Sequence, residues 1–357
     1  MISYVIIYFM NEKGKQLFFG GFIALFVIIL SLSGNLNNMA FCIACFIRDI
    51  AGAFNLHSNS ALQYLRPEII GLIMGAFITS LVTKEFSPKL GSSIFLRFII
   101  GNIVVIGALV FLGCPFRLII RLGTGDLNAV VGLLGLIAGI ILGSVFLTFG
   151  FSLGKAQKAS KALGCIPFII SLLLLAVLVL FPFLLNFSPE GVAAIHAPII
   201  ISLIISLAVS ALAYKSRLCM IGGIRDTYLL KDTLMLIPFV AIIVILIIFN
   251  LVNGTFNLSF TGHAVAHSDH LYNFLGLFIV GLGSVMLGGC PLRQLILAGS
   301  GNLDSLFTIF GFFTGSIISM NFGLAGTGNG VMLNGKIACY IAILILLIIV
   351  KLNLKRK

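Results

Sequence analysis

Long apolar runs alternate with short polar segments along the whole chain. A helix that crosses a membrane needs about 20 consecutive, mainly apolar residues, and ten runs approach or exceed that length. The pattern therefore predicts an all-α polytopic membrane protein. The ten predicted spans lie near residues 17–33, 66–84, 93–112, 127–150, 163–185, 194–214, 233–252, 271–289, 303–325 and 335–351.

Composition agrees with this pattern and excludes several kinds of protein. The chain is 60% hydrophobic and only 9% charged, whereas a soluble domain carries about 25% charged residues. The sequence contains no phosphate-binding G-x-x-x-x-G-K-[ST] loop, so an ATP-driven pump is not expected. It also lacks the helix motif of metalloproteases and the serine nucleophile elbow. We expect neither an enzyme nor a bound cofactor.

The net charge of +12 is distributed as in a membrane protein rather than a nucleic-acid binder. Lys155, Lys158 and Lys161 share one short loop, and the tail at 351–357 is basic. The predicted loops at 186–193, 253–270 and 326–334 contain no Lys or Arg. Because basic residues concentrate on the cytoplasmic side, the sequence predicts a protein of the inner (plasma) membrane with both termini in the cytoplasm.

A short motif occurs twice in the apolar chain. The segment GCPFR at 113–117 returns as GCPLR at 289–293, and the similarity continues without gaps through residues 128 and 304. Glycines then stay in register, Gly135 with Gly311 and Gly139 with Gly315. A repeat of this length predicts two related halves with a pathway between them.

A second repeated pair supports the same division. The segment CIACFIRD at 42–49 corresponds to CMIGGIRD at 219–226. Five spans in each half is an odd number, so the halves should lie upside down relative to each other, in an hourglass-like arrangement. The predicted parts are a cytoplasmic N-terminus at 1–16, inverted repeats at 17–185 and 186–351, and a basic cytoplasmic tail at 352–357.

The GCP segments have features of short re-entrant helices. Pro115 and Pro291 suit the first turn of a helix, where a missing N–H costs nothing. Gly113 and Gly289 would allow the chain to turn, and glycines at 123, 125, 299 and 301 would end the helices. Backbone at membrane depth is tolerated only when buried in protein or lining a cavity. We therefore expect half-helices whose N-termini point toward the middle of the membrane.

This arrangement predicts a site for a small anion. Helix N-termini attract anions, and Arg117 and Arg293 lie one turn beyond Cys114 and Cys290. Thiols suit a soft, polarizable atom such as sulfur or selenium. The predicted substrate path is formed by Cys114, Cys290, Cys219, Cys42, Arg117 and Arg293, with Cys45, Arg48 and Arg225 as possible accessory residues.

Each of these residues also has a purely structural interpretation. Free cysteines often pack as small apolar residues, which we favour for Cys165 and Cys339. Arg48 and Arg225 each precede an aspartate and could form structural ion pairs. Cys42 and Cys45 form a C-x-x-C, a spacing used in disulfides and metal sites, but the second copy has glycine in place of Cys45. The histidines at 263, 267 and 270 could bind a metal; we expect ordinary loop histidines and no metal site.

With these motifs the chain resembles the YeeE/YedE family of membrane transporters over nearly its whole length. The repeated GCP-x-R segments and the cysteine before Ile-Arg-Asp are similar to hallmarks of that family. The segments NMAFCIACFIRD at 38–49 and LQYLRPE at 62–68 resemble most the YedE branch associated with selenium metabolism. The resemblance implies thiosulfate uptake, with cysteines passing the anion inward through S–H hydrogen bonds, Cys114 and Cys290 at the centre and Cys219 on the same route.

Two interpretations stay open at this stage. The first is uptake of a small inorganic sulfur or selenium anion such as thiosulfate, with the lipid bilayer and a cytoplasmic sulfur- or selenium-carrier protein as partners and no role for nucleic acid. The second is a membrane thiol–disulfide oxidoreductase that uses Cys42 and Cys45. A soft-metal carrier is disfavoured because arginines and helix N-termini beside the thiols would repel a cation.

Overall fold

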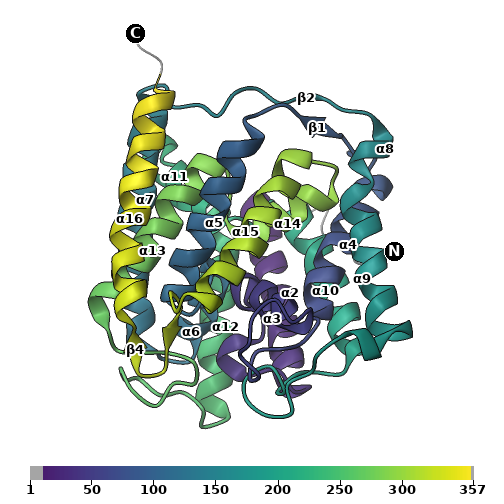
Figure 1. Cartoon of the computed structure of the whole chain (residues 1–357), viewed down its shortest axis with the longest axis vertical. Coiled ribbons are helices and arrows are strands. Elements are labelled where there is room, and N and C mark those ends of the chain that lie inside the picture. Colours follow the sequence, from purple (N-terminus) through teal and green to yellow (C-terminus); the bar gives the residue numbers. More distant parts are fainter. Residues whose placement is uncertain (1–10, 355–357) are drawn as a thin grey trace.

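Long helices run between two opposite faces of the molecule (Figure 1). The computed structural model describes residues 11–354. The predicted fold class, an all-α polytopic membrane protein, is confirmed. The longer helices are α2 (Glu12–Leu32), α4 (Pro67–Val82), α5 (Ile94–Val110), α7 (Leu127–Thr148), α9 (Ile166–Leu180), α10 (Ile199–Lys215), α12 (Ile237–Val252), α13 (His270–Leu287), α15 (Leu303–Asn321) and α16 (Leu333–Asn353).

Short elements fill the connections between these helices. Four of them are helices that begin inside the bundle: α3 (Ile43–Ala53), α6 (Pro115–Gly123), α11 (Met220–Leu230) and α14 (Pro291–Gly299). The others are α8 (Lys161–Gly164), the 3₁₀ turns η1 (Asn37–Met39), η2 (Pro182–Leu184) and η3 (Leu234–Leu236), and the strands β1 (Lys89–Leu90), β2 (Gln157–Lys158), β3 (Gly326–Thr327) and β4 (Gly330–Val331).

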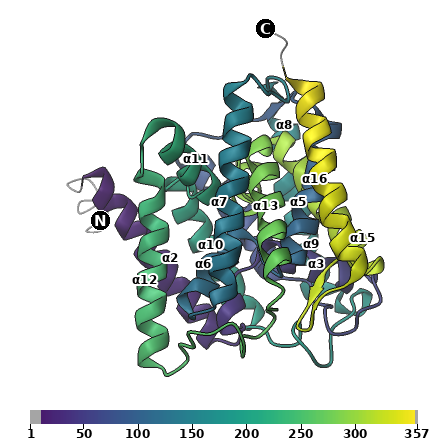
Figure 2. The same ribbon diagram turned by 90° about the vertical axis from the view of Figure 1, so that its left-hand side faces the viewer.

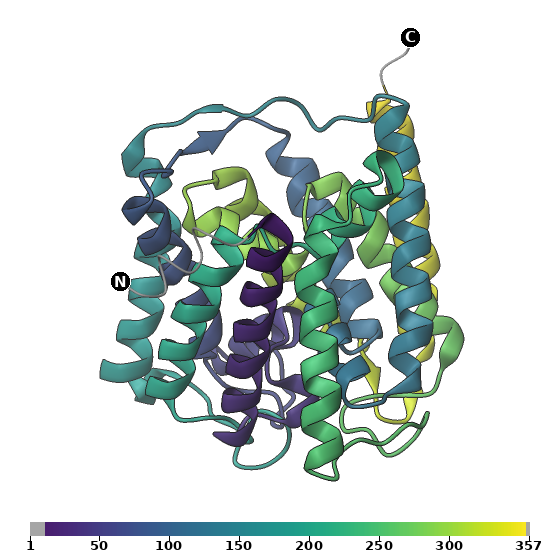
Figure 3. The same cartoon turned by 180° about the vertical axis from the view of Figure 1, so that it is seen from behind.

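The two ends of the bundle differ in charge. One end, which we call the basic face, carries the loops 83–93 and 149–160 and the last described residue of α16. Strands β1 and β2 pair there through Lys89 and Lys158, and the loop containing β2 crosses the whole face (Figures 1 and 3). The other end, the far face, carries the loops 33–42, 54–66, 181–198, 253–269 and 322–332. Arg66 is the only Lys or Arg in these far-face loops.

Helix length and composition support the predicted spans. Within residues 11–354, nine helical segments are long and apolar enough to cross a membrane, and the apolar α4 is shorter. Together they correspond to the ten predicted runs. Two of the nine segments, Ile94–Gly123 and His270–Gly299, each join a long helix to a short one, α5 to α6 and α13 to α14.

The two copies of the motif lie in opposite orientations, as the odd number of spans predicted. The turn after α6 meets the far face, where the Asn257 N–H donates to the Thr124 carbonyl at 3.0 Å. The turn after α14 meets the basic face, where the Lys89 N–H donates to the Gly301 carbonyl at 3.3 Å. The exact limits of the repeats remain a prediction, and the expected terminal segments at 1–10 and 355–357 lie outside the described residues.

The main helix pairs join one half to the other and repeat symmetrically. Helix α7 packs along α13 and α5 along α15, while α2 packs along α12 and α4 along α10; Figure 2 shows α12 and α2 together at one side. Glycines let the first two pairs approach closely. A Cβ at Gly135 would lie 2.1 Å from the Phe274 carbonyl oxygen, and one at the equivalent Gly311 would lie 2.3 Å from the Phe98 carbonyl oxygen. The last helix of each half breaks the symmetry, because α9 packs on α4 whereas α16 packs on α13 and α5.

We expect Gly135→Ala to destabilise the fold by about 1–3 kcal/mol, because the added methyl group overpacks a backbone contact that cannot move aside. Gly328→Ala is the matched control, since nothing lies within 4 Å of a Cβ at that position. Scanning calorimetry of the purified variants measures the effect without relying on tryptophan fluorescence, which this chain lacks. Equal unfolding temperatures for the two variants would contradict the packing argument.

Candidate functional site

Each of the four short internal helices begins at a cysteine. The residues at the N-cap positions are Cys42 for α3, Cys114 for α6, Cys219 for α11 and Cys290 for α14. The first N–H groups of a helix have no partner within it. In two of the helices the sulfur accepts one of them, from Cys45 N–H to Cys42 Sγ at 3.3 Å and from Gly222 N–H to Cys219 Sγ at 3.4 Å.

Three thiols gather on the far-face side of the centre. Cys42 Sγ and Cys45 Sγ lie 2.7 Å apart, and both residues are free thiols. The Ile43 N–H, at the start of α3, donates to Cys114 Sγ at 3.3 Å, and the thiols of Cys42 and Cys114 also interact. None of the three cysteines is exposed to solvent. The starts of α3 and α6 therefore meet at one sulfur-rich point.

The remaining two thiols of the predicted path form a pair nearer the basic face. The side chains of Cys219 and Cys290 interact with each other. A cavity of about 220 Å³ opens beside them, and its lining includes Cys219 and Arg293. Arg217 and Arg225 also line this cavity. The second thiol group is thus accompanied by three arginines.

The two groups adjoin without merging. Cys114 is near enough to Cys290 for an electrostatic interaction, but the hydrogen bond to Cys114 Sγ comes from α3. The expectation that the two GCP motifs lie toward the centre agrees with this placement, and each motif contacts the cysteine-capped helix of its own half. Interactions between neighbouring thiols connect them in the order Cys45, Cys42, Cys114, Cys290 and Cys219.

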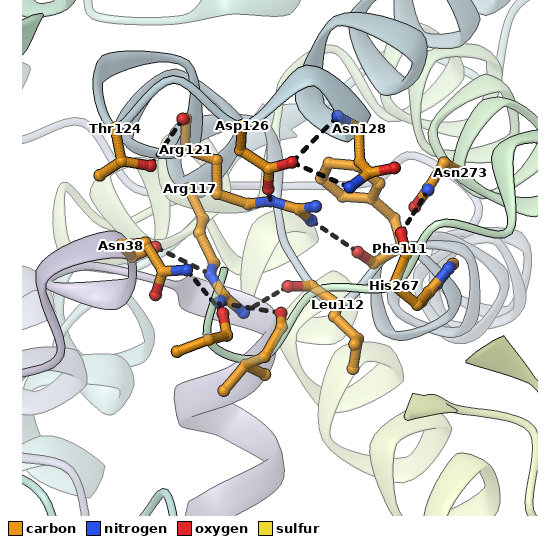
Figure 4. Close-up of polar contacts among 12 residues, drawn as sticks. Asn38, Phe111, Leu112, Arg117, Arg121, Thr124, Asp126, Asn128, His267 and Asn273 are labelled. Atoms are coloured by element: carbon orange, nitrogen blue, oxygen red, sulfur yellow. Dashed lines mark hydrogen bonds and ion pairs between the residues drawn. The ribbon is translucent and has the colours of Figure 1, made fainter. Parts of the chain in front are cut away.

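The equivalent arginines of the two motifs are used differently. The Arg117 guanidinium is fully buried and donates to backbone carbonyls of three segments (Figure 4). The acceptors are the carbonyls of Asn38 at 3.0 Å, Val265 at 3.2 Å, Ala264 at 3.5 Å and Leu112, and Nη1 also lies 3.5 Å from Cys45 Sγ. By contrast, Nη1 of Arg293 is buried and has no hydrogen-bond partner among residues 11–354. Arg293 lines both the thiol cavity and a neighbouring cavity of about 210 Å³.

A buried ion pair fixes the far end of α6. Arg121 Nε donates to Asp126 Oδ2 at 2.6 Å, and Nη1 donates to the Phe111 carbonyl at 2.9 Å (Figure 4). Asp126 also caps α7 by accepting from the Asn128 N–H at 2.9 Å. The second half has Leu297 and Asn302 at the positions of Arg121 and Asp126. Both charges of this ion pair are therefore present in one copy and absent in the other, so neither Arg121 nor Asp126 is buried without its partner.

Two further arginines share one carboxylate near the far face. Asp49 accepts from Arg48 at 2.8 Å and from Arg66 at 2.7 Å, and all three side chains are buried. The expected Arg48–Asp49 ion pair is therefore present, and the equivalent Arg225–Asp226 pair forms at 2.8 Å. With two cations for one anion, the Asp49 cluster carries an excess positive charge, and Arg48 lines a far-face cavity of about 450 Å³.

One of the loop histidines, His267, is held by the backbone. His267 donates from Nε2 to the Val110 carbonyl at 2.8 Å, since a carbonyl can only accept, and its Nδ1 accepts from the Asp269 N–H at 3.2 Å. Both ring nitrogens are thus occupied. Within residues 11–354, no three His, Cys, Asp or Glu side chains are grouped so as to hold a metal ion.

The second half of the chain can be compared with a known family. Residues 215–345 match the family model described as sulphur transport. The match contains Cys219, Cys290 and Arg293, and it supports the resemblance to the YeeE/YedE family and a role in sulfur transport across a membrane. No curated protein matches the chain. Cys42, Cys45 and Cys114 lie outside the matched segment and are connected to it by the internal repeat.

Sequence reasoning misplaced the turns before the half-helices and missed several contacts. The left-handed backbone lies one residue earlier than Gly113 and Gly289, at Leu112 with φ 61° and Gly288 with φ 81°. A Cβ at Gly113 would instead lie 3.1 Å from the Arg117 side chain, so that glycine leaves room for the arginine. The backbone acceptors of Arg117 were not predictable, because carbonyl groups have no sequence signature. Arg217, which lines both inner cavities, could have been suspected from its closeness to Cys219.

Replacing Asp126 alone should destabilise the protein strongly. Asp126→Asn leaves the Arg121 charge buried without a partner, which typically costs about 3–5 kcal/mol. The double variant Arg121→Leu/Asp126→Asn, which copies the second half, should lose less stability because no buried charge is left unpaired. Calorimetric unfolding of both variants tests this, and a double variant less stable than Asp126→Asn would contradict it.

Acidification should weaken the far-face loop that contains His267. Burial lowers the pKa of His267 below the ordinary value of 6.5. At pH values below about 6.5 the unfolded chain therefore binds a proton that the folded chain does not, and stability falls as pH falls. The contribution is complete above that pH. We expect the unfolding temperature to drop between pH 7.5 and pH 5.5, and to drop less in His267→Gln; an identical drop would assign the pH dependence to other groups, such as His57, whose pKa burial also lowers.

Proposed function

We propose that this protein takes up a small sulfur- or selenium-containing anion through the membrane, passing it along the five thiols in the order Cys45, Cys42, Cys114, Cys290 and Cys219. The observation that carries the proposal is that four helix N-termini, each capped by a cysteine, converge from both faces on the centre of the bundle. The sulphur-transport match over residues 215–345 supports the same function.

The chemistry of the path suits a soft anion. Helix N-termini and arginines supply positive potential, while a thiol is only a weak hydrogen-bonding group. A sulfur or selenium atom can therefore exchange one S–H partner for the next without being held tightly at any of them. At the inner end, Arg293 has a free buried donor beside Cys219 and Cys290, which makes it the residue best placed to bind the anion before release.

The distribution of charge between the two faces indicates the orientation of the protein in the membrane. Positive residues gather at the cytoplasmic side of membrane proteins, so the basic face would be cytoplasmic and the far face external. Helix α2 begins in the half of the bundle nearer the basic face, and α16 ends at that face (Figures 1 and 3). This arrangement supports the proposal that both termini are cytoplasmic and that the protein is an inner-membrane importer without enzymatic activity.

Two finer features belong to this proposal. The similarity of residues 38–49 and 62–68 to the selenium-associated YedE branch favours a selenium compound beside thiosulfate as a substrate. The arginine-lined cavity at the basic face would be the place where a cytoplasmic sulfur- or selenium-carrier protein receives the anion. The limits of the two inverted repeats at 17–185 and 186–351 follow from the same arrangement.

Uptake should depend on the central thiols. In cells that lack their own importers, we expect radiolabelled thiosulfate or selenite to enter with the wild-type protein, and Cys114→Ala or Cys290→Ala to lower the uptake rate at least about tenfold, as when a barrier rises by about 1.4 kcal/mol. Cys339→Ala, a buried thiol outside the path, is the control. Undiminished uptake in both central variants would refute the thiol path.

The thiol–disulfide oxidoreductase is the second candidate, and the 2.7 Å separation of Cys42 Sγ and Cys45 Sγ is the observation that favours it. The pair is fully buried, and the second copy has Gly222 instead of a second thiol. Cys45→Ser separates the two functions, because it would abolish electron transfer by an oxidoreductase but leave a measurable rate of anion uptake.

A further inference from the structure

A far-face cavity ends close to the first thiol of the path but does not reach it. The cavity of about 450 Å³ is lined by the buried Arg48 and by Leu112 and Val265. The carbonyls of Leu112 and Val265 are both acceptors for Arg117, and the same guanidinium contacts Cys45 Sγ at 3.5 Å. Arg117 therefore connects two residues of the cavity lining to Cys45 through direct contacts.

The two residues that Arg117 holds at the cavity are both in strained conformations. Leu112 has φ 61° and Val265 has φ 52°, in the left-handed region that side chains rarely adopt. For a β-branched residue such as Val265 this is a pronounced outlier. Such strain persists only where surrounding contacts maintain it, and it concentrates at clamps and switches. The Arg117 hydrogen bonds hold both carbonyls. At Leu112 the turn is also closed by the Gly113 N–H, which donates to the Ala108 carbonyl at 2.7 Å.

The segment that carries Val265 is anchored at its flanks and held by side chains in the middle. We call residues 261–266 the lid. On one side Asn128 donates to the Phe260 carbonyl at 2.8 Å, and on the other His267 donates to the Val110 carbonyl. Within the lid, the carbonyls of Ala264 and Val265 accept from Arg117, and that of Ala264 also accepts from Asn38 at 2.6 Å. Gly262, with φ 79°, provides a hinge.

The described part of the second half, up to residue 354, has no equivalent closure at its own end of the path. Gly288 occupies the position of Leu112 and adopts the left-handed backbone without a side chain. Arg293, the counterpart of Arg117, has an unpartnered nitrogen, and Cys219 borders a cavity. The described conformation is thus closed toward the far face and open toward the basic face.

We propose that Arg117 and the lid form an anion-operated gate at the far-face end of the thiol path. An anion that enters the cavity beside Arg48 is a stronger acceptor for the guanidinium than neutral carbonyls are. When Arg117 turns to the anion, the Leu112 and Val265 carbonyls are released, the strained backbone relaxes, and the cavity joins the thiols at Cys45. The proposal rests on the proposed anion transport, but the closure itself can be tested separately.

Thiol labelling tests the closure without any anion. Right-side-out vesicles are treated with a membrane-impermeant maleimide, and modification of Cys45, Cys42 and Cys114 is followed by site-resolved mass spectrometry. We expect Arg117→Gln to speed labelling of Cys45 by on the order of tenfold, the effect of losing one charge-assisted interaction. Arg293→Gln is the matched control and should leave this rate unchanged. Equal rates in wild type and Arg117→Gln would overturn the gate.

A second variant acts in the opposite direction, which distinguishes gating from misfolding. Val265→Gly keeps Arg117 and removes the backbone strain of the closed lid, so the lid should open less often. We expect slower Cys45 labelling and slower uptake than in wild type. Faster Cys45 labelling in Val265→Gly would contradict the proposal, because it would indicate that the substitution only loosens or partly unfolds the lid.

Amide hydrogen exchange in nanodiscs tests whether the anion operates the gate. Thiosulfate should speed exchange in residues 261–266 of the wild type, whereas in Arg117→Gln exchange should be fast already and unaffected by thiosulfate. An equal concentration of sodium chloride controls for ionic strength. If thiosulfate leaves wild-type exchange unchanged while uptake proceeds, the anion-operated gate is wrong and the transport function stands. If uptake is absent but Arg117→Gln still exposes Cys45, the closure stands and the transport function fails.

Discussion

The structure depends on how helix ends are satisfied at membrane depth. Four short helices begin inside the bundle, and their first N–H groups cannot be left to water. Sulfur takes this role at Cys42, Cys114 and Cys219, which accept from Cys45, Ile43 and Gly222 respectively. A thiol is a weak acceptor, so these N–H groups are satisfied but not strongly held. Cysteine at the N-cap thus allows a helix to begin inside the bundle. It also leaves the positive end of that helix able to attract an anion.

The two halves share a backbone plan and differ in how each is secured. Cysteine caps, prolines and close-packed glycines occur in both. Only the first half has the Arg121–Asp126 pair, and only there does the motif arginine bind carbonyls of three separate segments. The second half has Leu297 and Asn302 instead of the ion pair and leaves Arg293 partly unpaired. Duplication thus supplies two similar cysteine-capped motifs, and a few substitutions give the first motif more side-chain hydrogen bonds than the second.

Much of this arrangement can be predicted from the sequence, because it depends on the length of apolar runs, on the internal repeat and on prolines at fixed positions. Apolar runs indicate the spans, Pro115 and Pro291 mark the starts of half-helices, and an odd number of spans per half requires inversion. The sequence does not reveal contacts that depend on irregular backbone. The partners of Arg117 are carbonyls in loops that any residue could supply, and Leu112 is an unusual residue for a left-handed turn. Comparison of the copies shows Gly222 at the position equivalent to Cys45, but it cannot show the closeness of Cys45 to Arg117.

The pairing of helices across the halves has a consequence for how such a protein can move. Helices α7 and α5 of the first half lie backbone to backbone against α13 and α15 of the second, with glycines at the contacts. A rocking of one half against the other would have to separate these surfaces together with the α2–α12 and α4–α10 pairs. The packing of these helix pairs therefore opposes a movement of one half against the other. Movements of side chains and short loops, by contrast, disturb none of these helix pairs.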